Sequence, residues 1–175
     1  ENGLDSRIQA PVRPLAKAAR RARFGFFGQV THFKGVQVLL DAITRIPEAV
    51  WGDDAALDIF GGNLEHQPDA FQAEFRALLD KAGRRARLHG PYHGAELPRL
   101  MAGIDWVVMP SVWWENAPVV IQEAFHHRRP LIVSDIGGMA EKVRDGIDGL
   151  HFRTGSAQDL ADVLVRAISE RGLWQ

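Results

Sequence analysis

The chain of 175 residues contains no cysteine. A disulfide framework, a cysteine-ligated zinc site and a thiol nucleophile are therefore excluded. The chain also lacks an excess of either charge, because 21 lysines and arginines face 22 aspartates and glutamates for a formal net charge of −1. This near-balance argues against a nucleic-acid-binding protein that relies on a broad basic surface. No apolar run approaches the roughly 20 residues of a membrane helix, and no secretory signal opens the sequence, so we expect a cytoplasmic protein.

The sequence also lacks the common signatures of a metal site. Its seven histidines show no metal-ligand spacing, and neither a His-Glu-x-x-His nor an Asp-x-Asp motif is present. We therefore expect no metal and no resident cofactor.

What is present from Phe24 onward is an alternation of short apolar runs with longer stretches of helical period. The predicted strands are Phe24–Gly28, Leu57–Gly61, Ala86–His89, Trp106–Pro110, Pro130–Ser134 and Gly149–Phe152. The predicted helices are Gly35–Ile46, Ala70–Ala82, Ala95–Ala102, Pro118–His127, Met139–Asp145 and Gln158–Glu170. Six such units predict one α/β domain with a doubly wound, mostly parallel sheet of six strands.

Residues 1–23 differ from the rest in composition and charge. They carry six basic groups against Glu1 and Asp5, a local charge of +4, and little apolar pattern. We interpret this segment as a linker and residues 24–175 as the folded domain. A basic arm that contacts phosphate groups is the alternative interpretation.

Ligands of such sheets bind beyond the carboxyl ends of the strands, so the turns there are the candidate sites. The first turn, 28–35, begins with Gly28 and Gln29 and ends with Lys34 before a helix, which suits an anion. The second turn carries Gly61 and Gly62, and the fifth carries Gly137 and Gly138. Each could also be an ordinary tight turn, but one long ligand across the sheet edge would explain them together.

The fourth turn places two carboxylates around the start of a helix. Glu115 and Asn116 precede the helix expected from Pro118, and Glu123 lies inside it, about 8 Å along an axis that rises about 1.5 Å per residue. Free N–H groups at such a helix start bind anions, and carboxylates accept hydrogen bonds from hydroxyls. A sugar joined to a phosphate offers both groups. The alternative is that Glu115 only favours the helix dipole and Glu123 is a solvated helix residue.

Taken in order, these motifs resemble the donor-binding half of the family 4 glycosyltransferases. The motifs that carry the resemblance are Phe27-Gly28 to Lys34-Gly35, Phe60-Gly61-Gly62, Pro110-Ser111 with Glu115, Glu123-Ala124, Gly137-Gly138 with Glu141, Asp145-Gly146 and Gly149-Leu150. The resemblance covers residues 24–170, and Asn2-Gly3-Leu4-Asp5 resembles the end of the family's N-terminal domain. It implies a retaining, metal-independent enzyme of the GT-B fold, in which two Rossmann-like domains face each other across a cleft.

The resemblance also implies roles for individual residues. Lys34 would pair with the donor diphosphate, and Glu115 would accept hydrogen bonds from the hydroxyls of the donor sugar. Glu123 would hold the ribose. The remaining implied contacts are the glycine turns Gly28, Gly61 and Gly62, the loop residues His89 and Tyr92 near the base, and the backbone N–H groups of Asn116, Ala117, Pro118 and Val119. The family often has Arg where this chain has Gln29, which can donate hydrogen bonds to a phosphate but carries no charge.

The resemblance covers only one half of such an enzyme, so we expect the acceptor domain to be absent from this chain. We therefore expect a fragment that binds nucleotide sugar weakly and transfers nothing alone, with a glycan or lipid-linked acceptor held by the missing domain. Within the same fold an epimerase or phosphorylase half is the alternative, and outside it a non-catalytic module that binds a nucleotide or a partner.

Two further features remain open. Trp113 and Trp114 are interpreted as a core or interdomain plug, with a wall of the sugar or acceptor site as the alternative. The basic residues Lys81, Arg84, Arg85 and Arg87 are interpreted as a solvated helix end, with peripheral membrane contact as the alternative.

Overall fold

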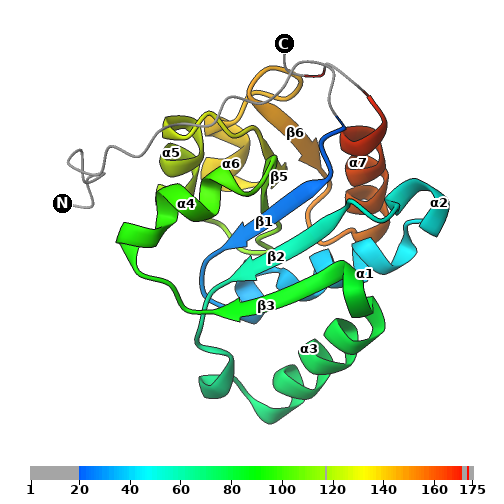
Figure 1. Ribbon diagram of the computed structural model, residues 1–175. Coiled ribbons are helices and arrows are strands. Elements are labelled where there is room, and N and C mark those ends of the chain that lie inside the picture. Colours follow the sequence, from blue (N-terminus) through cyan, green and yellow to red (C-terminus); the bar gives the residue numbers. More distant parts are fainter. Residues whose placement is uncertain (1–19, 117, 171–172, 174–175) are drawn as a thin grey trace.

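The computed structural model describes residues 20–116, 118–170 and 173. Its centre is a six-stranded sheet with every strand parallel to its neighbours, in the order β3-β2-β1-β4-β5-β6 (Figure 1). The strands are β1 (Arg23–Phe27), β2 (Ala56–Phe60), β3 (Ala86–Gly90), β4 (Trp106–Met109), β5 (Leu131–Ser134) and β6 (Gly149–Phe152). The predicted doubly wound α/β sheet is confirmed.

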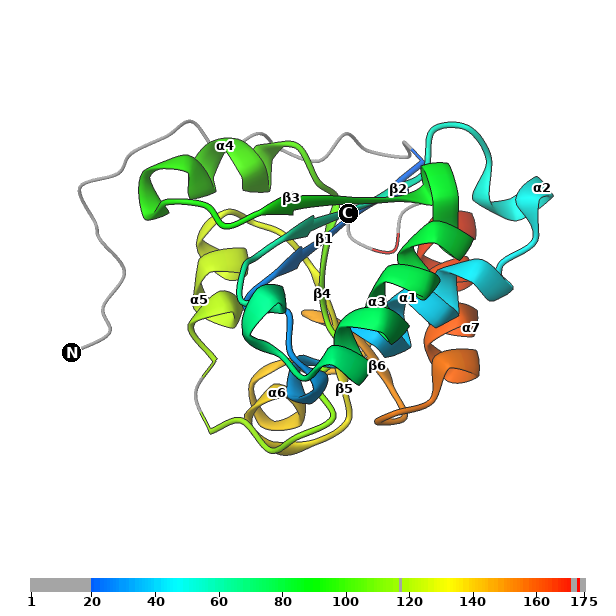
Figure 2. The ribbon, with the colours of Figure 1, turned by 90° about the horizontal axis from the view of Figure 1, so that it is seen from below.

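Helices cover both faces of this sheet. The helices are α1 (Val36–Arg45), α2 (Glu48–Trp51), α3 (Asp69–Ala82), α4 (Leu97–Ala102), α5 (Val119–His126), α6 (Gly137–Lys142) and α7 (Ala157–Ser169). Short 3₁₀ turns are η1 (His32–Lys34), η2 (Leu64–His66), η3 (Gly83–Arg85) and η4 (Gly94–Glu96). Figure 2 shows α1, α3 and α7 on one face and α4, α5 and α6 on the other.

Each face has its own apolar core, because side chains alternate along the strands. Phe24, Leu57 and Ile59 pack with α1, α3 and α7, whereas Phe27 and Val107 pack with α4, α5 and α6. The central strands are buried on both faces, as the continuous apolar runs predict.

The strand order creates one crevice. The chain after β1 turns to one face through α1, and the chain after β4 turns to the other through α5. Because these two strands are neighbours and their following helices lie on opposite faces, the carboxyl edge between them is the topological switch point of the sheet.

The helix that follows β5 differs from the prediction. It spans Gly137–Lys142 instead of Met139–Asp145. The glycine pair forms its first turn, where the Gly138 N–H donates to the Glu115 carbonyl over 2.6 Å, and Asp145 already forms a bridge to Gly149. The short helix α2 was not predicted, because four residues show no period.

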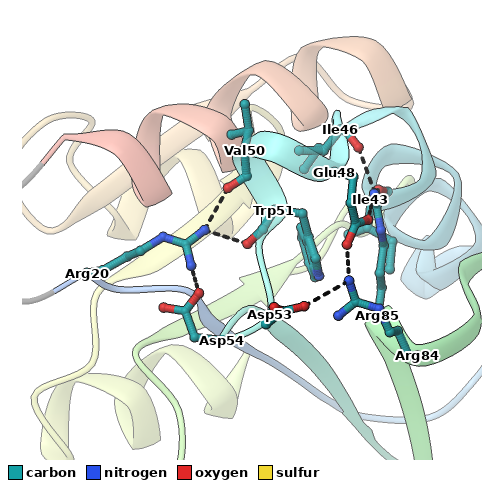
Figure 3. Close-up of polar contacts among 10 residues, drawn as sticks. All are labelled: Arg20, Ile43, Ile46, Glu48, Val50, Trp51, Asp53, Asp54, Arg84 and Arg85. Carbon is teal, nitrogen blue, oxygen red and sulfur yellow. Dashed lines mark hydrogen bonds and ion pairs between the residues drawn. The ribbon is translucent and has the colours of Figure 1, made fainter.

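The boundary of the proposed linker was also placed too late. Arg23 is the first residue of β1 and Ala22 is buried. Arg20 donates to the carbonyls of Val50 and Trp51 and pairs with Asp54 (Figure 3). Residues 20–23 thus belong to the domain because their polar groups hold its edge, and residues 1–19 lie outside the described chain.

Part of the basic run is structural rather than simply solvated. Arg85 donates to the carbonyls of Ile43 and Ile46 over 2.7 Å each, at the C-terminal end of α1, and its guanidinium lies 5.5 Å from the centroid of the Trp51 ring. Arg84 pairs with Glu48 and Asp53 (Figure 3). Arg85 thus stabilises the carbonyls at the end of α1, whereas Arg84 is held by two carboxylates.

Gly61 provides a test of the packing at the carboxyl edge. A Cβ on Gly61 would collide with the Gly28 carbonyl, so we expect Gly61→Ala to lower the free energy of unfolding by about 3 kcal/mol. Urea unfolding measures this loss. Gly94→Ala is the matched control, because a Cβ there meets nothing within 4 Å, and an equal loss in both variants would contradict the explanation.

Candidate functional site

An ion pair bridges the two loops of the switch point. Lys34, in the loop after β1, places its Nζ 2.9 Å from Oε2 of Glu115, in the loop after β4. The Ser111 hydroxyl donates to the other carboxylate oxygen of Glu115. The lysine and glutamate predicted to share one ligand are therefore brought together.

This ion pair lies in a cavity of about 220 Å³. The cavity is lined by Phe26 and Phe27 of β1, Val108 and Met109 of β4, Lys34, Ser111 and Glu115 of the loops, and Pro118, Val119 and Val120 around the start of α5. Lys34 is its single cationic lining residue within the described chain. The cavity thus combines a cation, a carboxylate and a helix N-terminus above an apolar floor.

The position of Lys34 depends on the glycine that follows it. Gly35 has φ 69°, in the left-handed region that favours glycine, and ends the turn that Thr31 caps. A Cβ on Gly35 would collide with the Pro110 carbonyl, and the Val112 N–H donates to the Phe33 carbonyl over 2.9 Å. The two loops therefore touch through their backbones.

The other glycine turns also serve contacts between loops. A Cβ on Gly138 would lie 2.6 Å from the Glu115 carbonyl oxygen, and the place of a Cβ on Gly61 is taken by the Gly28 carbonyl. The Gly62 carbonyl accepts from the Val30 N–H over 2.9 Å. In this structure the neighbour that approaches these glycines is another loop, whereas the sequence suggested a ligand.

Glu123 and Tyr92 form a second group beside the cavity. Glu123 lies on α5, half-buried, and does not line the cavity of Lys34 and Glu115. Burial raises the pKa of its carboxyl. Burial and then the charge of Glu123 raise the pKa of Tyr92 to about 12. The Tyr92 ring meets the Phe27 ring edge-on at 5.8 Å, and Phe27 also lines the cavity, so the two groups are neighbours.

His89 is directed to a different part of the sheet. Its Nε2 lies 2.8 Å from Oδ1 of Asp58, and its ring stacks on Phe60 at 4.7 Å. Burial opposes ionisation of Asp58, but hydrogen bonds from His89 and Arg23 lower the pKa of its carboxyl overall. His89 thus lines a separate hollow, of about 290 Å³, between the sheet face and α4.

The remaining predicted residues divide between the rim of the cavity and solvent. Pro118 and Val119 line the cavity. Proline has no backbone N–H, so the N–H contact expected from Pro118 cannot form. Gln29 and Asn116 are exposed, and Asn116 accepts from the Trp114 indole over 3.1 Å. Ala117 lies outside the described residues.

The tryptophans are not part of the core. Trp113 and Trp114 are 63% and 57% exposed, which corrects the interpretation of a core plug, and the interdomain plug stays a prediction. Sequence reasoning also assigned no role to Ser111, which orients Glu115. The Pro110-Ser111 pair directly after a buried strand was the available signal.

The described residues contain neither a metal-binding cluster nor a helix that could span a membrane. No three or more His, Asp or Glu side chains there are placed to hold a metal ion. None of the described helices is long and apolar enough to cross a membrane.

Comparison with known proteins identifies relatives over almost the whole domain. Residues 21–170 match the family model described as glycosyl transferases group 1. A D-inositol 3-phosphate glycosyltransferase of Nocardioides sp. is 31% identical over 176 residues, which cover 89% of this chain and 38% of the relative. The chain thus spans about two fifths of the curated relatives it matches.

Solved structures share the fold. The structure of HepE from Anabaena in complex with UDP has a TM-score of 0.69 at 26% identity and covers 86% of this chain and 40% of its own. Sucrose-phosphate synthase from Thermosynechococcus elongatus has a TM-score of 0.75 at 23% identity, over 87% of this chain and 37% of its own.

The raised pKa of Glu123 predicts a pH-dependent effect of Glu123→Gln on stability. The pKa of an unfolded glutamate is about 4.3, and the pKa of Glu123 in the folded protein is higher. Between these two values the folded state therefore binds more protons than the unfolded state. The free energy of unfolding therefore falls as pH rises through that window. We expect Glu123→Gln to melt above the wild type at neutral pH.

At about pH 3, where the carboxyl is protonated in both states, this advantage should vanish. Thermal melting by circular dichroism at the two pH values measures it. Glu74→Gln, at an exposed position of α3, controls for the loss of any one carboxylate. A Glu123→Gln gain that is the same at both pH values would contradict the assignment.

Proposed function

The chain belongs to the group 1 glycosyltransferases, and from this we propose that it is the donor-binding half of a retaining enzyme. The enzyme would move a hexose-type sugar from a nucleoside diphosphate to an acceptor hydroxyl. The observation that carries the proposal is the Lys34–Glu115 ion pair in a cavity at the switch point of the sheet.

Lys34 is proposed to bind the diphosphate. Its ammonium group pairs with Glu115 in the structure, and a diphosphate oxygen would be a more highly charged partner at the same place. If the diphosphate replaced Glu115 as the partner of Lys34, the Glu115 carboxylate would be free to accept hydrogen bonds from sugar hydroxyls. Ser111 would keep the carboxylate oriented through the hydrogen bond it already donates.

The start of α5 supports the same assignment. α5 has no capping side chain and no acidic residue in its first turn, and Val119 and Val120 line the cavity there. The N–H groups of a first helical turn and the helix dipole favour an anion. Together with Lys34 they would offset the charge that develops on the leaving diphosphate.

Glu123 and Tyr92 are proposed to hold the nucleoside. A half-buried carboxylate suits the two hydroxyls of a ribose, because hydrogen bonds compensate its desolvation. Tyr92 and the rest of the loop after β3 would lie near the base. His89 would contribute through its backbone, since its side chain is engaged by Asp58.

The proposed task of this half is to orient the donor and stabilise charge. Gln29 carries no charge, so a second cation on the diphosphate would come from the other half of the enzyme. The glycan or lipid-linked acceptor would be held largely there, and we propose that this chain alone transfers no sugar.

Nucleotide titration tests the proposed roles. We expect calorimetry to detect binding of UDP or GDP, or of their sugars, and Lys34→Ala and Glu123→Ala each to weaken it about tenfold to a hundredfold. That is the loss expected when a hydrogen bond to a charged group is removed.

Lys142→Ala and Glu74→Ala are the controls, because both residues are exposed on helices away from the cavity lining. If both site variants bound as tightly as the wild type, the site assignment would fail. A flat titration with every nucleotide would instead favour the partner-binding module.

We further propose that the donor binds without a metal ion, because Lys34 and the start of α5 offer the positive charge. The affinity for the nucleotide should then be the same, within about twofold, in EDTA as in Mg²⁺. Calorimetry in the two buffers measures it, and loss of binding in EDTA would show that a divalent ion bridges the diphosphate.

A further inference from the structure

Three large aromatic side chains next to the cavity are exposed. Phe33 is 57% exposed, Trp113 63% and Trp114 57%. Phe33 directly precedes Lys34, and the tryptophans directly precede Glu115. Exposed apolar groups bordered by polar residues commonly mark an interaction site.

Phe33 and Trp113 form a pair across the two loops. Their ring centroids lie 5.5 Å apart and the ring planes meet at 62°. The Val112 N–H donates to the Phe33 carbonyl over 2.9 Å, so the backbone that carries both rings is tied together. The pair is therefore a formed feature of the edge of the sheet.

Trp114 differs from this pair because it has partners of its own. Its indole N–H donates to Asn116 over 3.1 Å. Its ring comes within 3.2 Å of the place that a Cβ on Gly137 would take, so it lies over the start of α6. Trp114 is as exposed as Phe33, but it lies against the start of α6 and takes no part in the Phe33–Trp113 pair.

The chemistry beside the pair suits a sugar ring. A pyranose has apolar C–H faces and a rim of hydroxyls, which matches an aromatic face bordered by groups that form hydrogen bonds. Lys34 and Glu115, beside the pair in sequence, are groups of that kind. An aliphatic or purely polar ligand would use only one half of this arrangement.

The position of the pair indicates which sugar it meets. Neither Phe33 nor Trp113 lines the cavity that holds Lys34 and Glu115. If the proposed function holds, a donor sugar on its diphosphate occupies that cavity. A sugar ring that contacts Phe33 and Trp113, outside the cavity and next to it, then belongs to the molecule that receives the donor sugar.

Resting on the proposed function, we propose that Phe33 and Trp113 stack against a pyranose ring of the carbohydrate acceptor. The donor half would thereby provide part of the acceptor site. Each ring contributes a flat surface, so the contact depends on aromatic character and not only on apolar area.

The test follows the indole N–H signals of the ¹⁵N-labelled chain by NMR. The chain can be used as it is, because it contains the apolar cores on both faces of its sheet. Methyl α-D-glucopyranoside and methyl α-D-mannopyranoside serve as probes. We expect saturable shifts of the Trp113 signal with millimolar affinity, as single sugar rings usually bind weakly.

Substitutions assign the contact to the two rings. Phe33→Ala should weaken glycoside binding by about fivefold, and Phe33→Tyr should retain it, because the tyrosine keeps the ring. Trp113→Leu should lose glycoside binding, whereas Trp113→Phe should keep part of it. In these two variants binding is measured from the glycoside's own signals by saturation transfer. Ile147→Ala, at a position that is 59% exposed, is the control.

Several outcomes would overturn the proposal. The first is a Trp113 signal that responds to neither glycoside, or that responds equally in Phe33→Ala. The second is a larger Trp113 shift with UDP-glucose than with UDP, which would place the donor's own sugar on the pair. The third is a wild-type dimer that Trp113→Leu dissociates in sedimentation, which would make the pair a protein interface.

A UDP titration of the same samples separates this proposal from the proposed function. Wild-type binding of UDP without any glycoside response overturns only the aromatic acceptor site. A glycoside response without binding of any nucleotide overturns the proposed function and with it the assignment of the ring to an acceptor.

Discussion

The close approach of the loops after β1 and β4 is the constraint on which the site depends. The strand order makes β1 and β4 neighbours, and Gly35 lets the two loops touch where any side chain would collide with Pro110. In this arrangement Lys34 lies within 2.9 Å of Glu115. The cavity, the ion pair and the exposed aromatic pair are all consequences of the same backbone contact.

The glycine turns share one structural role, which is to let neighbouring loops approach closely. Gly61 meets the Gly28 carbonyl and Gly138 meets the carbonyls of Glu115 and Asn116, so each glycine admits a neighbouring loop. The loops are packed against one another through these backbone contacts. Side chains, more than open backbone, therefore determine what the edge of the sheet can bind, and this concentrates the proposed chemistry on Lys34, Glu115 and Glu123.

The charge of the cavity is incomplete for a diphosphate. Lys34 already has a partner in Glu115, and Gln29 in the same turn carries no charge. A domain that spans about two fifths of its curated relatives need not supply every group itself. The proposed division is that this half holds the nucleotide, offers one cation and a helix start, and borders the acceptor with aromatic rings.

The elements, the fold class and the loops proposed to carry the chemistry could be predicted from the sequence, because apolar periodicity and glycine positions are local signals. Five of the six predicted helices and all six strands lie within two residues of their predicted bounds at both ends. The helix after β5 was shifted because its start is set by the Glu115 carbonyl, a residue more than twenty positions earlier. Three contacts could be seen only in the folded structure. Lys34 and Glu115 form an ion pair, and the His89 side chain turns to Asp58. Phe33 and Trp113 form an exposed aromatic pair. The physical reason is that these contacts join loops distant in the chain, and no local pattern records which loops the sheet brings together.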